Sequence, residues 1–174
     1  MRLTKMIMPV LCGAFLAGCS SDDVHSEYQE WRELNDAYVA SIAAATDDAG
    51  KPVYTVIDPV WAPGNPSYVR WITDPALTQD NLQPLDNSTV IVNYTLHDLN
   101  GNQLDKGAGT SFKPCNTVTG FWSTLTSMHV GDSVQTVVPY TAGYGTLYSG
   151  NVRPYTTLIF SIRLKEISGY EIQP

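Results

Sequence analysis

The sequence predicts an α+β fold in which an antiparallel sheet curls over one short helix, with an added N-terminal helix. Three apolar residues, Phe121, Leu125 and Met128, stand at positions i, i+4 and i+7, which is the spacing of one apolar stripe on a short helix. Residues 158–165 instead alternate apolar and polar side chains, as a strand with one buried face does. Residues 134–138 show the same alternation before a proline. A helix between two such strands indicates a helix that packs against a sheet.

The first 18 residues have the pattern of a lipoprotein signal peptide. A basic start and a run of about eleven apolar residues lead to Leu-Ala-Gly-Cys at residues 16–19, the sequence that a lipoprotein signal peptidase cleaves. Such a run is too short to cross a bilayer as a stable helix. We therefore expect residues 1–18 to be removed, Cys19 to be lipidated, and residues 19–25 to form a tether at the membrane.

The mature chain is predicted to be acidic. The whole sequence has 10 basic and 17 acidic residues and a net charge of −7. Loss of Arg2 and Lys5 with the signal peptide leaves eight basic residues and a net charge of −9. Such a chain repels a phosphate backbone, so nucleic acid is not an expected partner. The lipid at Cys19, rather than basic charge, would attach it to a membrane.

The location and the cysteines agree with export. The Ser-Ser-Asp-Asp run after Cys19 resembles the acidic export tags of surface lipoproteins, so we expect the chain in the cell envelope, lipid-anchored at the outer membrane of a Gram-negative bacterium. Cys12 would leave with the signal peptide, and Cys115 then has no partner for an intramolecular disulfide. We expect Cys115 to be a small apolar residue rather than a reactive thiol.

The N-terminal helix is predicted over residues 26–50. Ser26 and Gln29 match a capping box, and the helix should end near residues 47–50. Its apolar residues recur at helical spacing: Tyr28, Trp31, Leu34, Tyr38, Ile42 and Ala45. The helix could mediate dimerisation, but a helix of about twenty residues more often packs on its own domain. We favour that interpretation and expect a monomer.

Residues 51–85 form a proline-rich segment with two strand-like runs, residues 53–57 and 68–72. Because proline cannot donate to a ladder, such strands lie at the edge of a sheet or end there. We expect Trp61 and Trp71 to cover part of the core.

The strand over residues 89–98 is clearer. Val90, Val92, Tyr94 and Leu96 alternate onto one face, and Asn100–Gly101 is a strong hairpin turn. A later loop, rich in glycine and threonine, contains four tyrosines that could cover a pocket: Tyr140, Tyr144, Tyr148 and Tyr155.

Other chemistries find little support. His25, His97 and His129 lie on different predicted elements without paired spacing, so no metal site is expected. No G-x-S-x-G elbow of a hydrolase is present.

Five motifs occur in the order known from one family. They are V-I-V-N-Y-T-L-H-D-L-N-G-N-Q-L-D, the short helix, M-x-V-G, an x-G-Y-G loop and an x-P-x-x-T-L-x-F strand. This half of the chain resembles the FKBP-type peptidyl-prolyl isomerases. The resemblance implies an FKBP-like domain over residues 51–168, a tail over residues 169–174, proline-containing polypeptides as partners, and no cofactor or metal.

The resemblance also places the site. Phe121 would form the floor under the substrate proline, and Tyr144 would donate its hydroxyl to the carbonyl before that proline. Asp105 would accept a hydrogen bond from Tyr94 and fix its phenol. The remaining substrate-binding walls would be Phe112, Val118, Val152 and Phe160.

Four positions depart from the family pattern. Phe121 replaces the usual tryptophan and Leu104 the usual phenylalanine, while Asn151 and Arg153 replace an apolar residue and a proline of the flap. Leu104 and Asn151 would make the pocket wetter, which weakens a mechanism that depends on excluding water. Three hypotheses follow. The first is an envelope prolyl isomerase or folding helper, and the second a non-catalytic binding module on a surface lipoprotein that holds a protein or glycan partner in its wetted pocket or on its proline-rich face. The third, suggested only by the N-terminal helix, is a lipid-anchored structural component of a larger envelope assembly.

Overall fold

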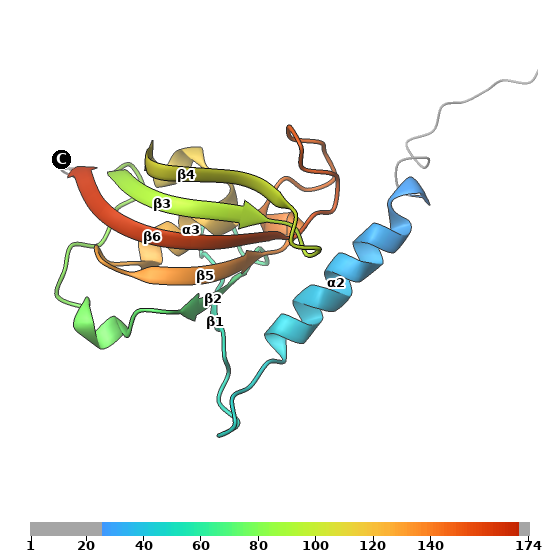
Figure 1. Cartoon of the computed structure of the whole chain (residues 1–174), viewed down its shortest axis with the longest axis horizontal. Helices are drawn as coiled ribbons and strands as arrows, with labels where there is room; N and C mark the ends of the chain where they lie inside the picture. Colours follow the sequence, from blue (N-terminus) through green and yellow to red (C-terminus); the bar gives the residue numbers. More distant parts are fainter. Residues whose placement is uncertain (1–25, 171–174) are drawn as a thin grey trace, which may run out of the picture.

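A computed structural model describes residues 26–170 of the chain. Figure 1 shows a curved sheet, a short helix α3 within its curve and a longer helix α2 beyond its end. The predicted signal peptide, Cys19, the tether and residues 171–174 lie outside the described residues. No helix among residues 26–170 is long and apolar enough to cross a membrane.

The sheet has six strands in the order β1-β2-β5-β6-β3-β4, and every neighbouring pair is antiparallel. In chain order the elements are α2 (Gln29–Ala43), β1 (Thr55–Ile57), β2 (Ser67–Trp71), β3 (Thr89–His97), β4 (Gln103–Phe112), α3 (Thr119–Ser127), β5 (Ser133–Val138) and β6 (Leu158–Gly169). The predicted α+β fold, with a sheet curled over one short helix, is therefore confirmed.

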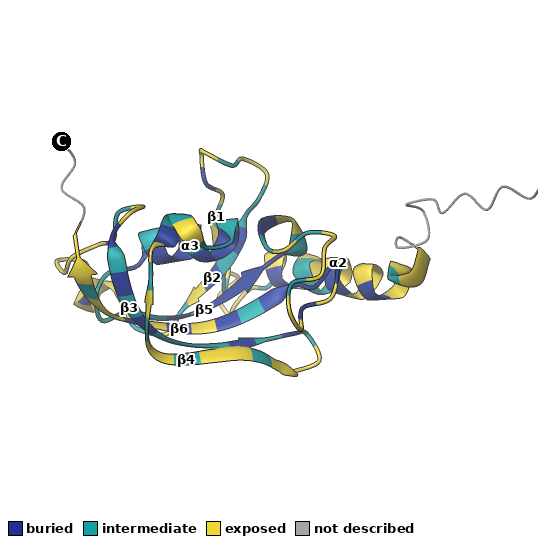
Figure 2. Cartoon of the chain, turned by 90° about the horizontal axis from the view of Figure 1, so that it is seen from above, coloured by how far each residue is buried: buried dark blue, intermediate teal, exposed yellow. Residues whose placement is uncertain are grey.

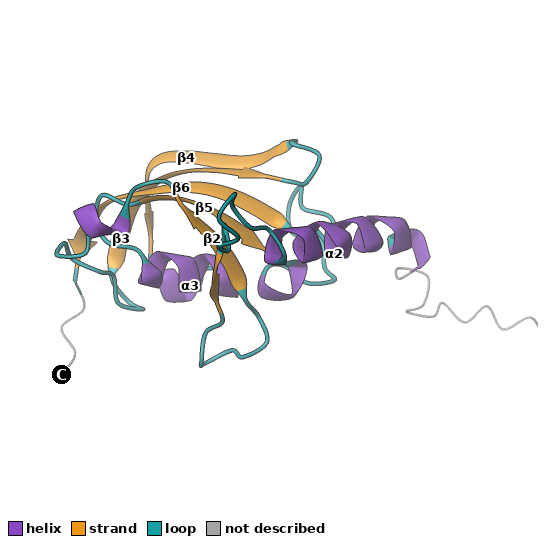
Figure 3. Ribbon diagram, turned by 90° about the horizontal axis from the view of Figure 1, so that it is seen from below, coloured by secondary structure: helices purple, strands orange, loops and turns teal. Residues whose placement is uncertain are grey.

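Helix α3 contributes the centre of the core. Its predicted stripe, Phe121, Leu125 and Met128, is buried against the sheet. Figure 2 shows the buried residues gathered between α3 and the strands, and Figure 3 shows the sheet arched over that helix. The alternation predicted for β6 is also present, since its side chains at 158, 160, 162 and 164 are buried and those at 161, 163 and 165 are exposed. Full burial of each such apolar side chain stabilises the fold by about 1.5–3 kcal/mol.

Gly120 allows α3 to approach β5 closely. A Cβ atom at this position would lie 2.4 Å from Cγ1 and 2.8 Å from Cγ2 of Val138, whose side chain is fully buried. Real side chains do not approach so closely, and a buried valine has little freedom to move. The glycine is therefore required by the distance between helix and strand.

The β3–β4 hairpin has the predicted turn. Gly101 has φ of 81°, a conformation that glycine adopts without strain. The buried carboxylate of Asp98 accepts hydrogen bonds of 2.9 Å from the backbone N–H groups of Asn100 and Asn102. Further along, β4 has a bulge opposite Asn93, whose side-chain oxygen accepts from the Gly109 N–H at 2.8 Å.

The N-terminal helix packs on its own domain, as we favoured. Trp31, Asn35 and Ile42 are buried. The helix begins at Gln29 and ends at Ala43, a few residues earlier than expected. The N-cap position of α2 is occupied by Tyr28, which makes no side-chain cap, rather than by Ser26, and the Gln29 amide donates to Glu33. Leu34, expected on the packed face, is 56% exposed.

The proline-rich segment supplies the edge of the sheet. β1 is the edge strand and pairs only with β2, in agreement with the proline content around it. Trp71 packs against the core as expected. The expectation for Trp61 is wrong, because its ring is 44% exposed and stacks on Trp122 at a centroid distance of 3.8 Å. The loop between β1 and β2 therefore covers the outer side of α3 rather than the core.

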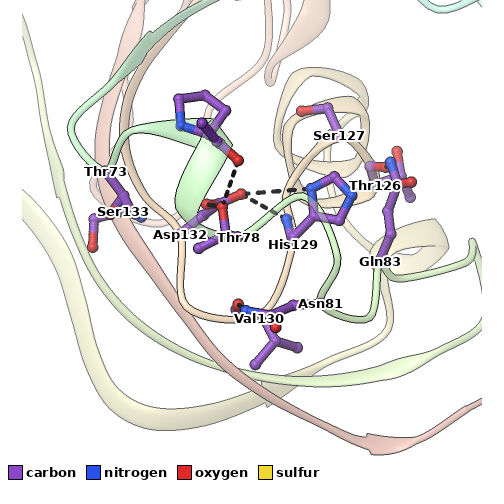
Figure 4. A network of polar contacts seen from close by, with 12 residues as sticks. Thr73, Thr78, Asn81, Gln83, Thr126, Ser127, His129, Val130, Asp132 and Ser133 are labelled. Carbon is purple, nitrogen blue, oxygen red and sulfur yellow. Dashed lines mark hydrogen bonds and ion pairs between the residues drawn. The ribbon is translucent and has the colours of Figure 1, made fainter.

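A buried carboxylate joins the segment before β3 to the turn after α3 (Figure 4). Asp132 is fully buried and accepts hydrogen bonds from the Thr78 hydroxyl at 2.5 Å and the His129 backbone N–H at 2.7 Å. Asn81 adds a bond of 2.8 Å to the Val130 carbonyl. This network fixes where α3 ends and β5 begins.

Substitution of Gly120 by alanine should destabilise the fold. Although alanine favours a helix by about 1 kcal/mol over glycine, the contact with Val138 should outweigh this and leave a net loss of about 1–3 kcal/mol. Urea unfolding of the Gly120→Ala chain measures it. In the double variant Gly120→Ala, Val138→Ala the clash is absent, so the two changes should show a favourable coupling energy. Equal or greater stability of Gly120→Ala alone would contradict the packing argument.

Candidate active site

A cavity of about 330 Å³ opens between the sheet and the N-terminal end of α3. Its lining comes from β3, β4, the segment before α3, α3 itself, the loop after β5, and β6. The lining residues are Tyr94, Leu96, Asp105, Phe112, Asn116, Thr117, Val118, Phe121, Tyr144 and Phe160. Seven of the eight predicted site residues are thus brought to one cavity from segments far apart in the sequence.

Phe121 lies at the base of an aromatic cluster. It is 4% exposed, and its ring centroid lies 4.7 Å from that of Phe160 and 5.6 Å from that of Phe112. Tyr94 approaches it edge-on at 6.2 Å. The edge-to-face and tilted geometries are those that aromatic pairs favour. The cavity therefore has a rigid apolar floor, continuous with the core below it.

Tyr94 and Asp105 form a polar pair at the rim. The Tyr94 hydroxyl donates a hydrogen bond of 2.7 Å to Oδ2 of Asp105, the pair expected from the sequence. Burial, the hydrogen bond and the charge of Asp105 together raise the pKa of Tyr94 to about 12. Gly107 makes room for the ring, because a Cβ there would lie 2.6 Å from Tyr94 Cε1. The phenol is therefore held in one position and stays protonated at neutral pH.

Tyr144 is on the loop between β5 and β6, opposite this pair. Its side chain is 38% exposed and lines the cavity, and it lies near enough to Tyr94 to contribute to the raised pKa of that phenol. A hydroxyl at this position can donate to a ligand carbonyl at the mouth of the cavity. The other tyrosines of the loop, Tyr140, Tyr148 and Tyr155, do not line the cavity.

Val152, predicted as a wall, does not line the cavity either. It is buried in the hydrophobic core and closes a tight turn with Ser149, with mutual backbone hydrogen bonds of 2.9 and 3.1 Å. Asn151 and Arg153 are exposed beside it, and Asn151 therefore does not wet the cavity as we expected. Leu104 packs against the core.

The sequence analysis missed three lining residues. Leu96 had been identified on the buried face of its strand, but the periodicity gave no reason to separate it from core residues. Asn116 and Thr117 precede α3 and belong to no motif. They make the lining partly polar on the side where the chain enters the helix.

A larger hollow of about 740 Å³ lies on the outer face of the sheet. Its lining mixes polar and apolar strand residues, including Arg70, Ile72, Gln135 and Arg163. Because it is open and has no aromatic cluster, it is a poor match to an enclosed ligand site. The smaller aromatic cavity is the candidate active site despite its size.

Residues 26–170 contain no group of three or more His, Cys, Asp or Glu side chains placed to hold a metal ion. His129 contacts Asp132 within the structural network described above. Cys115 is half-buried, and its thiol contacts the Asn87 side-chain oxygen at 3.0 Å.

A six-stranded antiparallel sheet arched over one short helix, with an aromatic cavity between them, defines an FKBP-like domain. Comparison with known proteins gives the same result. The sequence profile of the family described as FKBP-type peptidyl-prolyl cis-trans isomerase matches residues 81–165. These residues are just under half of the chain, so over this part the chain is similar to that family.

Several relatives are similar to this chain. FkpA, an FKBP-type peptidyl-prolyl cis-trans isomerase of Escherichia coli K12, is 27% identical over 88 residues, which are 48% of this chain and 33% of FkpA. The chain thus matches about a third of the length of its curated relatives. The crystal structure of Escherichia coli FkpA superposes with a TM-score of 0.68 at 18% identity, covering 86% of this chain and 65% of that one. The crystal structure of a peptidyl-prolyl cis-trans isomerase from Pseudomonas syringae pv. tomato superposes with a TM-score of 0.64 at 20% sequence identity. The match covers 80% of this chain and 94% of that one.

The raised pKa of Tyr94 gives a testable pH dependence. The folded chain holds this proton more tightly than the unfolded chain, whose tyrosine has a pKa near 10, so the free energy of unfolding should fall as the pH rises from about 10 to about 12. Asp105→Asn should lower the pKa of Tyr94 but leave it above 10, because burial, the largest cause, remains. NMR titration of ring-labelled tyrosines in both chains measures this. A Tyr94 pKa near 10 in the unsubstituted chain would contradict the geometry.

Proposed function

We propose that this chain is a peptidyl-prolyl cis-trans isomerase, or a folding helper with that activity, acting on Xaa-Pro bonds of polypeptides. The observation that carries the proposal is the aromatic cavity with Phe121 at its base and the hydroxyls of Tyr94 and Tyr144 at its rim. The similarity to FKBP-type isomerases supports it.

The reaction requires a moderate reduction of one barrier. Rotation about an Xaa-Pro bond has a barrier of about 18–20 kcal/mol and takes tens to hundreds of seconds unaided. Exchange in milliseconds requires a barrier lower by roughly 5–7 kcal/mol. No covalent intermediate is needed, because no bond other than the amide's partial double bond changes.

The cavity supplies this reduction through its polarity. A planar amide is a strong dipole that water solvates well, whereas the twisted amide of the transition state has lost resonance and much of that dipole. An apolar site therefore favours the twisted form relative to the planar one. In the proposed complex the proline ring rests on Phe121, with Phe112, Val118 and Phe160 around it, and this is the arrangement that excludes water.

The rim orients the substrate. Tyr144 donates a hydrogen bond to the carbonyl that precedes the proline, which fixes that side of the bond while the other side rotates. Asp105 restrains the Tyr94 phenol, so that the ring remains an apolar wall with its hydroxyl already satisfied. Restraint of this kind lowers the entropy cost of reaching the transition state.

The test uses residues 20–174 and an Xaa-Pro peptide whose exchange is followed by NMR. The intact chain should accelerate exchange, and Tyr144→Phe should lower kcat/KM about tenfold, which corresponds to the loss of one hydrogen bond. Phe121→Ala should abolish the acceleration, although it also removes a buried ring. Phe121→Trp restores the family's usual residue and should remain active. The matched control is Tyr170→Phe, because the Tyr170 hydroxyl donates to the Gln83 carbonyl and does not line the cavity.

No acceleration by the intact chain would refute the isomerase proposal. The alternative is then the non-catalytic binding module. It predicts a partner that still binds the Phe121→Ala chain and is lost with Trp61→Ala, since Trp61 stacks on Trp122 with nearly half of its side chain exposed.

We also propose that the chain is anchored in the envelope by lipid at Cys19. The support is the basic start, the short apolar run and the Leu-Ala-Gly-Cys sequence at residues 16–19. A lipidated N-terminus would keep the isomerase near newly exported polypeptides.

Replacement of Cys19 by alanine should prevent lipidation and release the chain from the membrane. The unsubstituted chain, expressed in a Gram-negative host with a radiolabelled fatty acid, should carry label and sediment with membranes. The Cys19→Ala chain should carry no label and should be recovered in the soluble fraction. Cys115→Ala, which lies outside the motif, should behave as the unsubstituted chain. Label retained in Cys19→Ala would contradict the anchor.

A further inference from the structure

Helix α2 packs against the loop between β5 and β6 that carries Tyr144. The contacting residues stand at i, i+3, i+4 and i+7, on one face of the helix. They are Tyr28, Trp31, Arg32 and Asn35. Figure 1 shows α2 running past the end of the sheet from which this loop projects. The loop is unusually well covered for a connection, since residues 154–157 are all buried.

Trp31 is held from two directions. Its indole N–H donates to the Thr156 hydroxyl at 3.1 Å, and the Arg153 guanidinium lies 4.1 Å from the centroid of its ring. Both partners belong to the loop. At the N-terminal end of the helix, the hydroxyls of Tyr28 and Tyr148 form a hydrogen bond and their rings meet edge-on.

Asn35 fixes the position of the helix along the loop. It is fully buried, and its Oδ1 accepts from the Thr157 backbone N–H at 2.7 Å while its Nδ2 donates to the Trp31 carbonyl at 2.7 Å. A buried amide is stable only where such partners are present, so sliding of the helix would leave it unpaired. An apolar side chain would pack there without this restriction.

The path from α2 to the cavity is short. Arg32 lies over the ring of Tyr155, which is buried with φ of 60°, a conformation that a bulky residue keeps only where its surroundings hold it. The Tyr155 backbone N–H donates to the Gly145 carbonyl at 2.9 Å. Gly145 directly follows Tyr144. The helix therefore supports, through one residue and one backbone hydrogen bond, the backbone that places the Tyr144 hydroxyl.

We propose that α2 is a clamp that positions Tyr144, and that Trp31 and Asn35 are positioning residues of the candidate active site. The effect on catalysis rests on the proposed isomerase function, whereas the clamp itself does not. Tyr144 is partly exposed and lies on a loop rather than on a strand. The position of its hydroxyl therefore depends on how rigidly the loop is held. Release of α2 lets the loop move and misplaces the donor.

The experiment compares Trp31→Ala and Asn35→Ala with Ile42→Ala in residues 20–174. Ile42 is also buried on α2, but it lies about 16 Å further along the helix from Trp31. All three variants weaken helix packing, so all should lower the Tm. At a temperature where each is folded, only Trp31→Ala and Asn35→Ala should lower kcat/KM, by about tenfold, and broaden the ring signals of Tyr144. Trp31→Phe keeps a ring for Arg153 and should lose less activity.

Hydrogen exchange at the Tyr155 amide separates the two proposals. If the intact chain is inactive but Trp31→Ala accelerates exchange of this amide and Ile42→Ala does not, the clamp stands and the isomerase proposal fails. Equal effects of Trp31→Ala and Ile42→Ala, on activity or on exchange, would overturn the clamp. Should both alanine variants at 31 and 35 unfold, Tyr28→Phe tests the same claim, because it removes only one hydroxyl from an exposed pair at the start of the helix and should still increase exchange at Tyr155.

Discussion

The close approach of α3 to the sheet is the constraint on which the rest of the structure depends. Gly120 permits it, because its missing side chain lets the first turn of the helix rest on Val138. The next residue, Phe121, is then pressed against Phe160 and serves at once as part of the core and as the base of the cavity. Since one ring does both, the cavity cannot be reshaped without altering the packing beneath it. Stability and the proposed activity are tied at this residue.

Elements with regular periodicity could be predicted because one face of each is buried along the part of the element that shows the pattern. β6 and α3 are such elements, and their buried residues match the apolar positions of the sequence. The Asn100–Gly101 turn could be predicted equally well, because it requires a residue with positive φ and Gly101 provides it. By contrast, the start of α2 could not be predicted from Ser26 and Gln29, because the N-cap position is occupied by Tyr28, a residue type that does not mark helix starts.

The candidate site could be located only through the resemblance to a family, and its errors have a physical cause. Val152 and Phe160 are both apolar and both buried, and nothing in their own residue types distinguishes a wall of the cavity from the core. Asn35 shows the converse error, a buried residue that the sequence pattern does not predict because its side chain is polar. A polar residue on a packed helix face is unexpected, yet its burial is favourable here because both ends of its amide find backbone partners, one of them 122 residues away in the chain.

One departure from the family pattern in the flap, Arg153, is explained by helix α2. Arg153 stands where the family has a proline, and in this chain its guanidinium lies over Trp31. Asn151, exposed in the same turn, lies outside the cavity and so does not add water to it. A proline at 153 could not make the contact with Trp31, and an apolar residue at 151 would be exposed to solvent. In this loop Arg153 meets α2, whereas Tyr144 lines the cavity. Considered alone, the change at residue 153 suggests that the site has been lost. Its contact with Trp31 suggests instead that α2 holds the flap in place.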